Sequence, residues 1–222
     1  MEYFESWKDL VNPEFYIKLG GFWLVLFIIF AETGLFAGFF LPGDSLLFIS
    51  GIYSQSIIRE TFGDLGNDFL NTFLLANCIT LAAVIGNEVG YYFGHRMGEK
   101  LYQKEDTLLF KKRYLYQADD FFKQKGSFAV IIARFLPIVR TFIPIVAGIV
   151  KMDKKKFLKD NIIGAILWAY ILVFAGHYLY KILKDQYGFD LTHHLEIIVL
   201  GLVLVTTLPV IIKMFFGKTR EK

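Results

Sequence analysis

The sequence predicts an all-α integral membrane protein, a multi-span helical bundle that contains two re-entrant helical hairpins in inverted-topology repeats. Of its 222 residues, 55% are hydrophobic and 18% aromatic, more than the polar side chains of a soluble domain of this length could cover. Several stretches of about 20 residues are almost free of charge, which is the length that a helix needs to span a bilayer. Two of these stretches carry prolines that a straight spanning helix would not easily tolerate.

Charge is concentrated between the apolar stretches and is nearly absent within them. The stretches cover residues 22–58, 69–94, 126–150, 161–180 and 197–212. The charged side chains inside them are Glu32, Asp44, Glu88, Arg134 and Arg140. The N-terminal segment, residues 1–21, starts with acidic residues where a signal peptide would be basic, so we expect the first apolar segment to remain uncleaved.

The distribution of Lys and Arg predicts the orientation of the chain in the membrane. Residues 95–125 carry eight of these cations, residues 151–160 carry five and residues 213–222 carry four. The connections 54–68 and 181–196 carry only one and two. Because cytoplasmic loops are enriched in Lys and Arg, we expect the first three regions, including the C-terminus, to be cytoplasmic.

This orientation places both ends of one apolar stretch on the same side of the membrane. We therefore expect residues of about 126–150 to form a re-entrant hairpin, with breaks at Pro137 and Pro144. One continuous spanning helix, kinked by its prolines, is the alternative. The stretch 22–58 is too long for one span and is interrupted at Pro42-Gly43, a turn dipeptide, which predicts another hairpin at about 33–58.

The two predicted hairpins share short sequence matches. Phe-Leu-Pro occurs at residues 40–42 and 135–137, and is followed by Gly51-Ile52 and Gly148-Ile149. The helices that come next contain Gly94-His95 and Gly176-His177. Since one hairpin would open outward and the other inward, the repeats would have inverted topology, an architecture that places the substrate site of a transporter at the repeat interface.

The remaining segments complete a membrane domain of residues 22–180. Residues of about 101–125 place apolar side chains at helical spacing among lysines, which predicts an amphipathic helix on the cytoplasmic leaflet. A solvated linker is the alternative for that segment. Residues 181–222 are expected to form a C-terminal transmembrane helix with a basic tail.

The charged residues inside the apolar stretches are the candidate functional residues. Placing Glu32, Asp44, Arg134 and Arg140 at mid-bilayer would cost on the order of 10 kcal/mol, so we expect the two acids and two arginines to meet and neutralise one another. Guanidinium groups present planar donors that can bind the oxygens of a phosphate. Carboxylates in a low-dielectric medium can take up and release protons. Purely structural salt bridges are the alternative, and the position of Glu88 leaves both interpretations open.

Other classes of function find little support in the sequence. A net charge of +3 does not indicate nucleic-acid binding, and the single Cys78 excludes an intramolecular disulfide. The four histidines and one cysteine show no metal-ligand spacing, and no hydrolase or phosphate-loop motif is present. We therefore expect no enzyme activity, no metal and no cofactor.

Four stretches resemble the DedA family of membrane proteins, whose domain is shared with eukaryotic lipid scramblases. They are Glu32 with Phe40-Leu-Pro42-Gly43-Asp44-Ser45-Leu46-Leu47 and Gly51, Gly86-Asn87 with Gly90-Tyr91 and Gly94, residues 125–148, and Gly164 with Trp168. The third stretch is the most specific, because Arg134, Pro137, Arg140, Thr141, Pro144 and Ala147-Gly148 rarely coincide. Asn87 and His95 stand where relatives often have Asp and Arg.

The resemblance implies a multi-pass protein of the cytoplasmic membrane that translocates a phosphate-bearing lipid, undecaprenyl phosphate or a phospholipid, driven by protons. It places the functional acids on Glu32 and Asp44 and the functional arginines on Arg134 and Arg140. A proton-coupled carrier of small cations or drugs, a lipid-phosphate phosphatase and a structural assembly factor are the alternatives. The sequence leaves open whether copies associate into a homo-oligomer.

Overall fold

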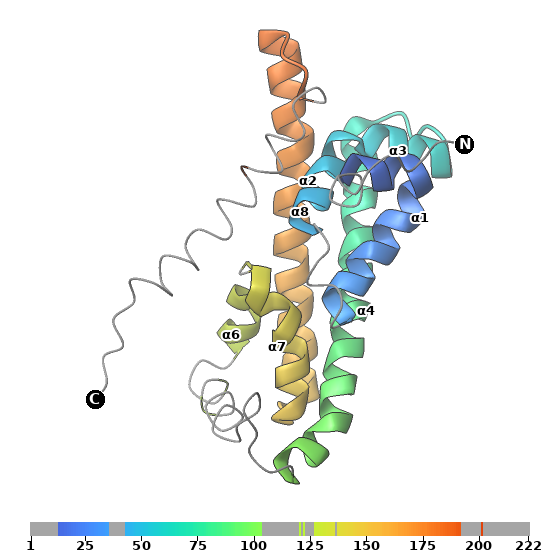
Figure 1. Cartoon of the computed structure of the whole chain (residues 1–222). Coiled ribbons are helices and arrows are strands. Elements are labelled where there is room, and N and C mark those ends of the chain that lie inside the picture. The colour runs from blue at the N-terminus through green and yellow to red at the C-terminus, as the bar shows by residue number, and fades with distance from the viewer. Residues whose placement is uncertain are drawn as a thin grey trace.

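The computed structural model describes residues 13–35, 43–103, 120, 122, 127–135, 137–191 and 201, and within these ranges all regular structure is helical (Figure 1). The helices are α1 (Pro13–Gly34), α2 (Gly43–Ile52), α3 (Ser54–Phe62), α4 (Asp68–Gln103), α6 (Ser127–Ala133), α7 (Pro137–Ile149) and α8 (Lys154–Tyr187). Two of them, over Asp68–Gly98 and Lys154–Tyr187, are long and apolar enough to cross a membrane. The predicted all-α class is confirmed, and the two long apolar helices agree with a membrane protein.

The long helices α4 and α8 run antiparallel and define the two ends of the bundle. At the upper end in Figure 1, Lys181 near the end of α8 pairs with Asp68 at the start of α4, with 2.8 Å between Nζ and Oδ2. At the lower end, the Lys154 ammonium at the start of α8 lies 4.5 Å from the ring centroid of Tyr92 on α4. The end with Lys181 and Asp68 is called the upper end below, and the end with Lys154 and Tyr92 is called the lower end.

The outer surface of the long helices is apolar, unlike the surface of a water-soluble protein. Large apolar side chains on the outside of α1, α4 and α8 are exposed, among them Trp23 at 70%, Leu81 at 60% and Ile171 at 54%. Glu32, Arg134 and Arg140, by contrast, are buried between the helices. This distribution suits a bilayer, whose hydrocarbon solvates apolar side chains and excludes charge.

The short helices α2 and α7 start in the middle of the bundle and run in opposite directions. Asp44 in the first turn of α2 bonds to Arg140 in the first turn of α7, so the two N-terminal ends meet. From this point α2 reaches the level of His177 on α8, toward the upper end. In the opposite sense, α7 reaches the level of His95 on α4, toward the lower end.

Close glycine contacts fix α2 to α8. A Cβ on Gly51 would overlap the carbonyl oxygen of Val173, and a Cβ on Gly176 would overlap the carbonyl oxygen of Phe48. The two backbones therefore touch without side chains between them, which only glycine permits at these positions.

The same reciprocal contact fixes α7 to α4. A Cβ on Gly148 would overlap the carbonyl oxygen of Tyr91, and a Cβ on Gly94 would overlap that of Ile145. Each of these glycines has its counterpart at the same place in the other pair, Gly148 with Gly51 and Gly94 with Gly176. Helix α2 thus packs on α8, which follows α7 in the chain. In the same way, α7 packs on α4, which follows α2.

Of the two prolines in the second predicted hairpin, Pro137 lies at a break as expected and Pro144 does not. Helix α6 ends at Ala133 and α7 begins at Pro137, so two short helices replace a single kinked helix. The expected break at Pro144 is wrong, because Pro144 lies inside α7. Its ring is accommodated beside α4, where a Cβ added to Gly90 would lie 3.3 Å from the Cβ of Pro144.

In the first predicted hairpin α1 ends at Gly34 and α2 begins at Gly43, while Pro42 lies outside the described residues. The amphipathic helix expected at about 101–125 and most of the C-terminal segment expected at 181–222 also lie outside them. Helix α8 continues to Tyr187, so it crosses the boundary that was expected after residue 180.

Gly176→Ala should lower the free energy of unfolding by about 1–3 kcal/mol, because its new methyl group meets a backbone carbonyl that cannot move aside. Gly164→Ala on the same helix is the matched control, since the nearest atom to an added Cβ there is 3.4 Å away. Chemical unfolding in detergent micelles measures both. Equal effects of the two substitutions would contradict the rigid backbone contact.

Candidate functional site

Arg140 binds two carboxylates at the centre of the bundle. Its Nη2 donates to Oε1 of Glu32 on α1, and its Nη1 donates to Oδ1 of Asp44 on α2. Glu32 and Arg140 are 2% and 8% exposed, so both charges are removed from solvent. Together with Arg134, these residues are called the charge cluster below.

The ends of three helices position the cluster. Glu32 lies in the last turn of α1, and its carboxylate rests against Gly43 so closely that any Cβ there would overlap it. Asp44 and Arg140 lie in the first turns of α2 and α7. A carboxylate in a first turn lies at the positive end of the helix dipole, which is a favourable position for a negative charge.

Trp168 on α8 connects the two arginines. Its indole Nε1–H donates to Oδ1 of Asp44 over 2.8 Å. The Cζ atoms of Arg140 and Arg134 lie 5.0 and 5.5 Å from the indole centroid, within the range of a cation–π contact. One aromatic side chain therefore orients an acid and holds both guanidinium groups.

Arg134 differs from Arg140 in its partners. Its Nη1 donates to the side-chain and backbone oxygens of Asn161, over 2.8 and 3.2 Å. Among the described residues no carboxylate pairs with it, and its buried Nη2 has no hydrogen-bond partner. Arg134 is only 3% exposed, so the structure holds a buried cation that is bound by neutral groups.

Asn161 links Arg134 to α4. Its amide nitrogen donates to the carbonyl of Val84 over 3.2 Å, and its Oδ1 lies 2.8 Å from the amide nitrogen of Asn87. If the Asn87 amide is turned by 180°, its oxygen lies 2.9 Å from Nη1 of Arg134 and its nitrogen 3.0 Å from the carbonyl of Thr33. In either orientation, the side-chain amides of Asn161 and Asn87 lie next to the Arg134 guanidinium.

The structure therefore joins three of the four predicted charges directly and the fourth through Trp168. Among the described residues, no hydrogen bond or ion pair joins Glu88 to either arginine, but Glu88 interacts with Asn161, which binds Arg134. Trp168 and Asn161 belong to the site although the sequence did not predict them there. The available signal was their polarity, since each places an N–H donor in a stretch without charged residues, 161–180.

Comparison with known proteins supports the resemblance found in the sequence. The model of the VTT domain matches residues 41–178, which include Asp44, Arg134, Arg140 and Trp168. Protein DedA of Escherichia coli K12 is 37% identical over 201 residues, which cover 89% of this chain and 85% of that protein. The chain belongs to the DedA family.

Two other family members extend the comparison. An uncharacterized membrane protein of Mycobacterium tuberculosis H37Rv is 35% identical over 211 residues, covering 92% of this chain and 86% of that protein. The inner membrane protein YqjA of Escherichia coli K12 is 32% identical over 178 residues, covering 80% and 74%. No solved structure matches the chain significantly. With its apolar helices, this family membership identifies the chain as a membrane protein.

Arg140→Ala should lower the free energy of unfolding by about 3–5 kcal/mol, because it leaves two carboxylates in a buried site without their counter-ion. The triple variant Glu32→Gln, Asp44→Asn, Arg140→Met removes all three charges and should regain much of this loss. Chemical unfolding in micelles measures both. A triple variant that is no more stable than Arg140→Ala would show that pairing is not what the cluster contributes.

Proposed function

We propose that this DedA protein moves a phosphate-bearing lipid across the cytoplasmic membrane, coupled to protons. The observation that carries the proposal is the state of Arg134, a buried guanidinium bound only by neutral groups among the described residues. A buried cation is costly without an anion, and a planar guanidinium with a free Nη2 suits a phosphate oxygen.

The helix ends favour the same ligand. The N-terminal turns of α2 and α7 meet at the charge cluster from opposite sides. Free N–H groups and the positive ends of helix dipoles attract anions, and transporters use interrupted helices in this way at the bilayer midplane. Two helix ends and two guanidinium groups would surround one head group.

The architecture of inverted repeats belongs to the same proposal. We infer that the chain re-enters at about 33–58 and 126–150, with α2 and α7 as the equivalent half-helices. Their opposite directions and their equivalent glycine contacts support this arrangement. The lysine-rich lower end, with residues 151–153 and the first turns of α8, would face the cytoplasm, as would the C-terminus.

The charges of the buried site suggest how lipid movement would be coupled to protons. Two acids and two arginines sum to zero, so the entry of a phosphate would leave the buried site negative unless protons enter too. Protonation of Glu32 or Asp44 would release Arg140 from that carboxylate and free its donors for the phosphate. A phosphodiester, with one negative charge, would then carry about one proton, and a monoester up to about two.

Helix packing indicates which parts move. Glycine contacts join α1 and α7 to α4, and α2 to α8, forming two packed units. The first unit carries Glu32 and Arg140, while Asp44 on α2 belongs to the second. The Arg140–Asp44 bond crosses between the units, as do the bonds of Asn161 on α8 to Val84 and Asn87 on α4. Loss of the Arg140–Asp44 bond on protonation would therefore remove one of the contacts that hold the units together.

Arg140→Lys should reduce transport of a fluorescent phosphate lipid in reconstituted vesicles by about 10- to 100-fold, because lysine cannot form two directed hydrogen bonds at once. Insertion should be close to wild type, since the charge is kept, and thermal unfolding should lie between wild type and Arg140→Ala. The double variant Arg134→Ala, Arg140→Ala should be inactive. Wild-type transport by both variants would reject phosphate binding at this site.

Two controls separate the proposal from its rivals. A small-cation carrier predicts thermal stabilisation by the cation and none by the phosphate lipid, the reverse of our expectation. A lipid-phosphate phosphatase predicts release of inorganic phosphate during the assay, whereas transport leaves the lipid intact.

Glu32→Gln should reduce proton uptake by about one proton per phosphate lipid moved, because the variant site is already one charge more positive. A pH-sensitive dye inside the vesicles, read beside the lipid signal, measures this ratio. Asp44→Asn is the matched variant and should give the same change. An unchanged ratio in both variants would reject the two carboxylates as the proton carriers.

A further inference from the structure

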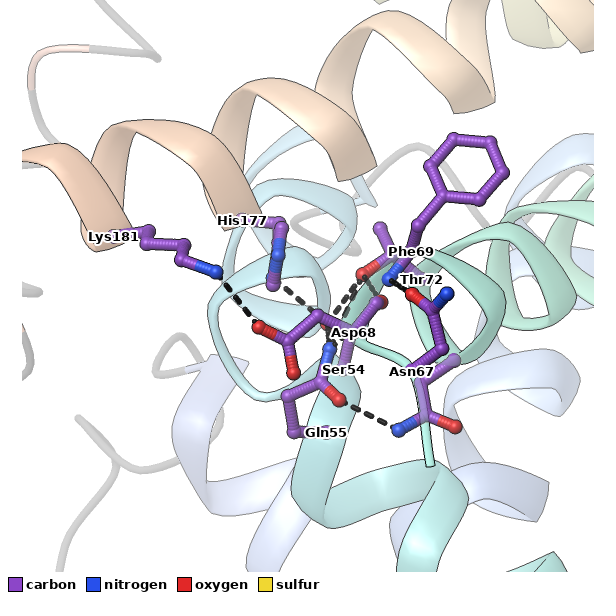
Figure 2. Close-up of polar contacts among 9 residues, drawn as sticks. Ser54, Gln55, Asn67, Asp68, Phe69, Thr72, His177 and Lys181 are labelled. Carbon is purple, nitrogen blue, oxygen red and sulfur yellow. Dashed lines mark hydrogen bonds and ion pairs between the residues drawn. The ribbon is translucent and has the colours of Figure 1, made fainter. Parts of the chain in front are cut away.

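A second polar cluster lies at the upper end of the bundle, where α3, α4 and α8 meet (Figure 2). Ser54 Oγ lies 3.0 Å from Thr72 Oγ1 and 3.3 Å from Nδ1 of His177. Ser54 and Thr72 are fully buried and His177 is 5% exposed. The three side chains form a hydrogen-bonded chain of groups that can each donate and accept a proton.

Polar contacts continue from this chain to the surface. Gln55 Nε2 donates to the backbone carbonyl of Asp68 over 3.0 Å, and Thr72 Oγ1 donates to the same carbonyl over 2.9 Å. The Asp68 carboxylate is exposed and pairs with Lys181, which is exposed as well (Figure 2). Three hydrogen bonds therefore connect the buried imidazole, through Ser54 and Thr72, to the backbone of Asp68, whose carboxylate is exposed.

Two buried oxygens beside the chain can accept further hydrogen bonds. Asn71 is 1% exposed and binds Gln55 through its amide nitrogen over 2.6 Å, while its Oδ1 has no partner among the described residues. Ser50 on α2 is fully buried, and its hydroxyl oxygen likewise has none. Packing alone does not require these polar groups, because aliphatic side chains would fill such positions at no desolvation cost.

The second cluster and the charge cluster share two helices. On α8, Trp168 binds Asp44 and His177, nine residues later, binds Ser54, a separation of about 14 Å along the helix. Helix α2 has Asp44 in its first turn and ends at Ile52, two residues before Ser54. Ser50 lies between the two sites on this helix.

His177 is the only group in the hydrogen-bonded chain of the second cluster that changes charge near neutral pH, while the hydroxyls can only relay a proton. The charged groups that face it are Asp68 on α4 and Lys181 on α8, which pair with each other. On α3, Arg59 pairs with Asp64 at the surface over 3.3 Å. The imidazole is thus near both signs of charge and tied to neither by a salt bridge.

We propose that His177 exchanges protons between the water at the upper end and the carboxylates of the charge cluster, with Ser54, Thr72 and Ser50 as relay groups. This inference rests on the proposed proton coupling and extends it to a residue outside the phosphate site. It assigns the upper cluster a function in coupling rather than in lipid binding.

His177→Asn tests the proposal, because an amide nitrogen can take the place of Nδ1 toward Ser54 but cannot carry a proton. Transport driven by a pH gradient in vesicles should fall by about tenfold or more. Exchange of the phosphate lipid at equal pH on both sides should stay within about twofold.

His95→Asn is the matched control. His95 follows Gly94 as His177 follows Gly176, but it is exposed at the lower end and stacks on Tyr91 with 6.0 Å between ring centroids. Its substitution should leave gradient-driven transport near wild type. An equal loss in both histidine variants would overturn the assignment to His177.

The possible results distinguish this inference from the proposed function. If wild-type transport does not respond to the gradient, the proposed proton coupling fails and the role of His177 fails with it. If wild type is coupled and His177→Asn is coupled equally, only the inference fails. A parallel loss of gradient-driven transport and exchange would show a structural role, which also overturns it.

A measurement on the wild-type protein avoids any question of folding. NMR of histidine labelled with ¹⁵N in micelles should show the His177 imidazole changing its protonation between about pH 5 and pH 8. An imidazole signal that stays constant over this range would overturn the proposal.

Discussion

The structure depends on the neutralisation of buried charge. Arg140 binds Glu32 and Asp44 at the same time, and these residues come from α7, α1 and α2. In a bilayer none of the three could remain ionised alone at an acceptable free energy. The requirement for pairing therefore brings three helix ends to one point. Gly43 lets α1 and α2 meet there, because any Cβ at this position would overlap the Glu32 carboxylate.

The two arginines of the charge cluster have different partners. One arginine holds both acids, while the other is held by Asn161 and faces the indole of Trp168. A purely structural network would be expected to pair each acid with its own arginine and leave no donor unused. The observed arrangement leaves Nη2 of Arg134 without a hydrogen-bond partner among the described residues. In the proposed function, neutralisation of one carboxylate would free the Arg140 donor that binds it.

The two polar clusters lie at opposite ends of the contact between α2 and α8, and Ser50 is a buried polar side chain on α2 between them. The backbones of these helices touch through Gly51 and Gly176, so the contact that connects the two clusters is closely packed. The pair α4 and α7 has no comparable buried polar cluster at its outer end among the described residues, where His95 is exposed. This asymmetry sets the upper end apart from the lower end.

The sequence by itself determined the membrane class, the family and the residues that carry charge into the bilayer, because hydropathy and isolated charges are local properties of the chain. It also indicated the break before Pro137, since proline favours the first turn of a helix. The position of Pro144 inside α7 depended on space beside Gly90, which no local pattern reveals. Only the tertiary structure decided that Arg140 takes both acids, that Trp168 joins the arginines and that Ser54 meets His177. These contacts join residues 96, 108 and 123 positions apart in the chain for Asp44–Arg140, Glu32–Arg140 and Ser54–His177, and their choice among competing partners is made by packing.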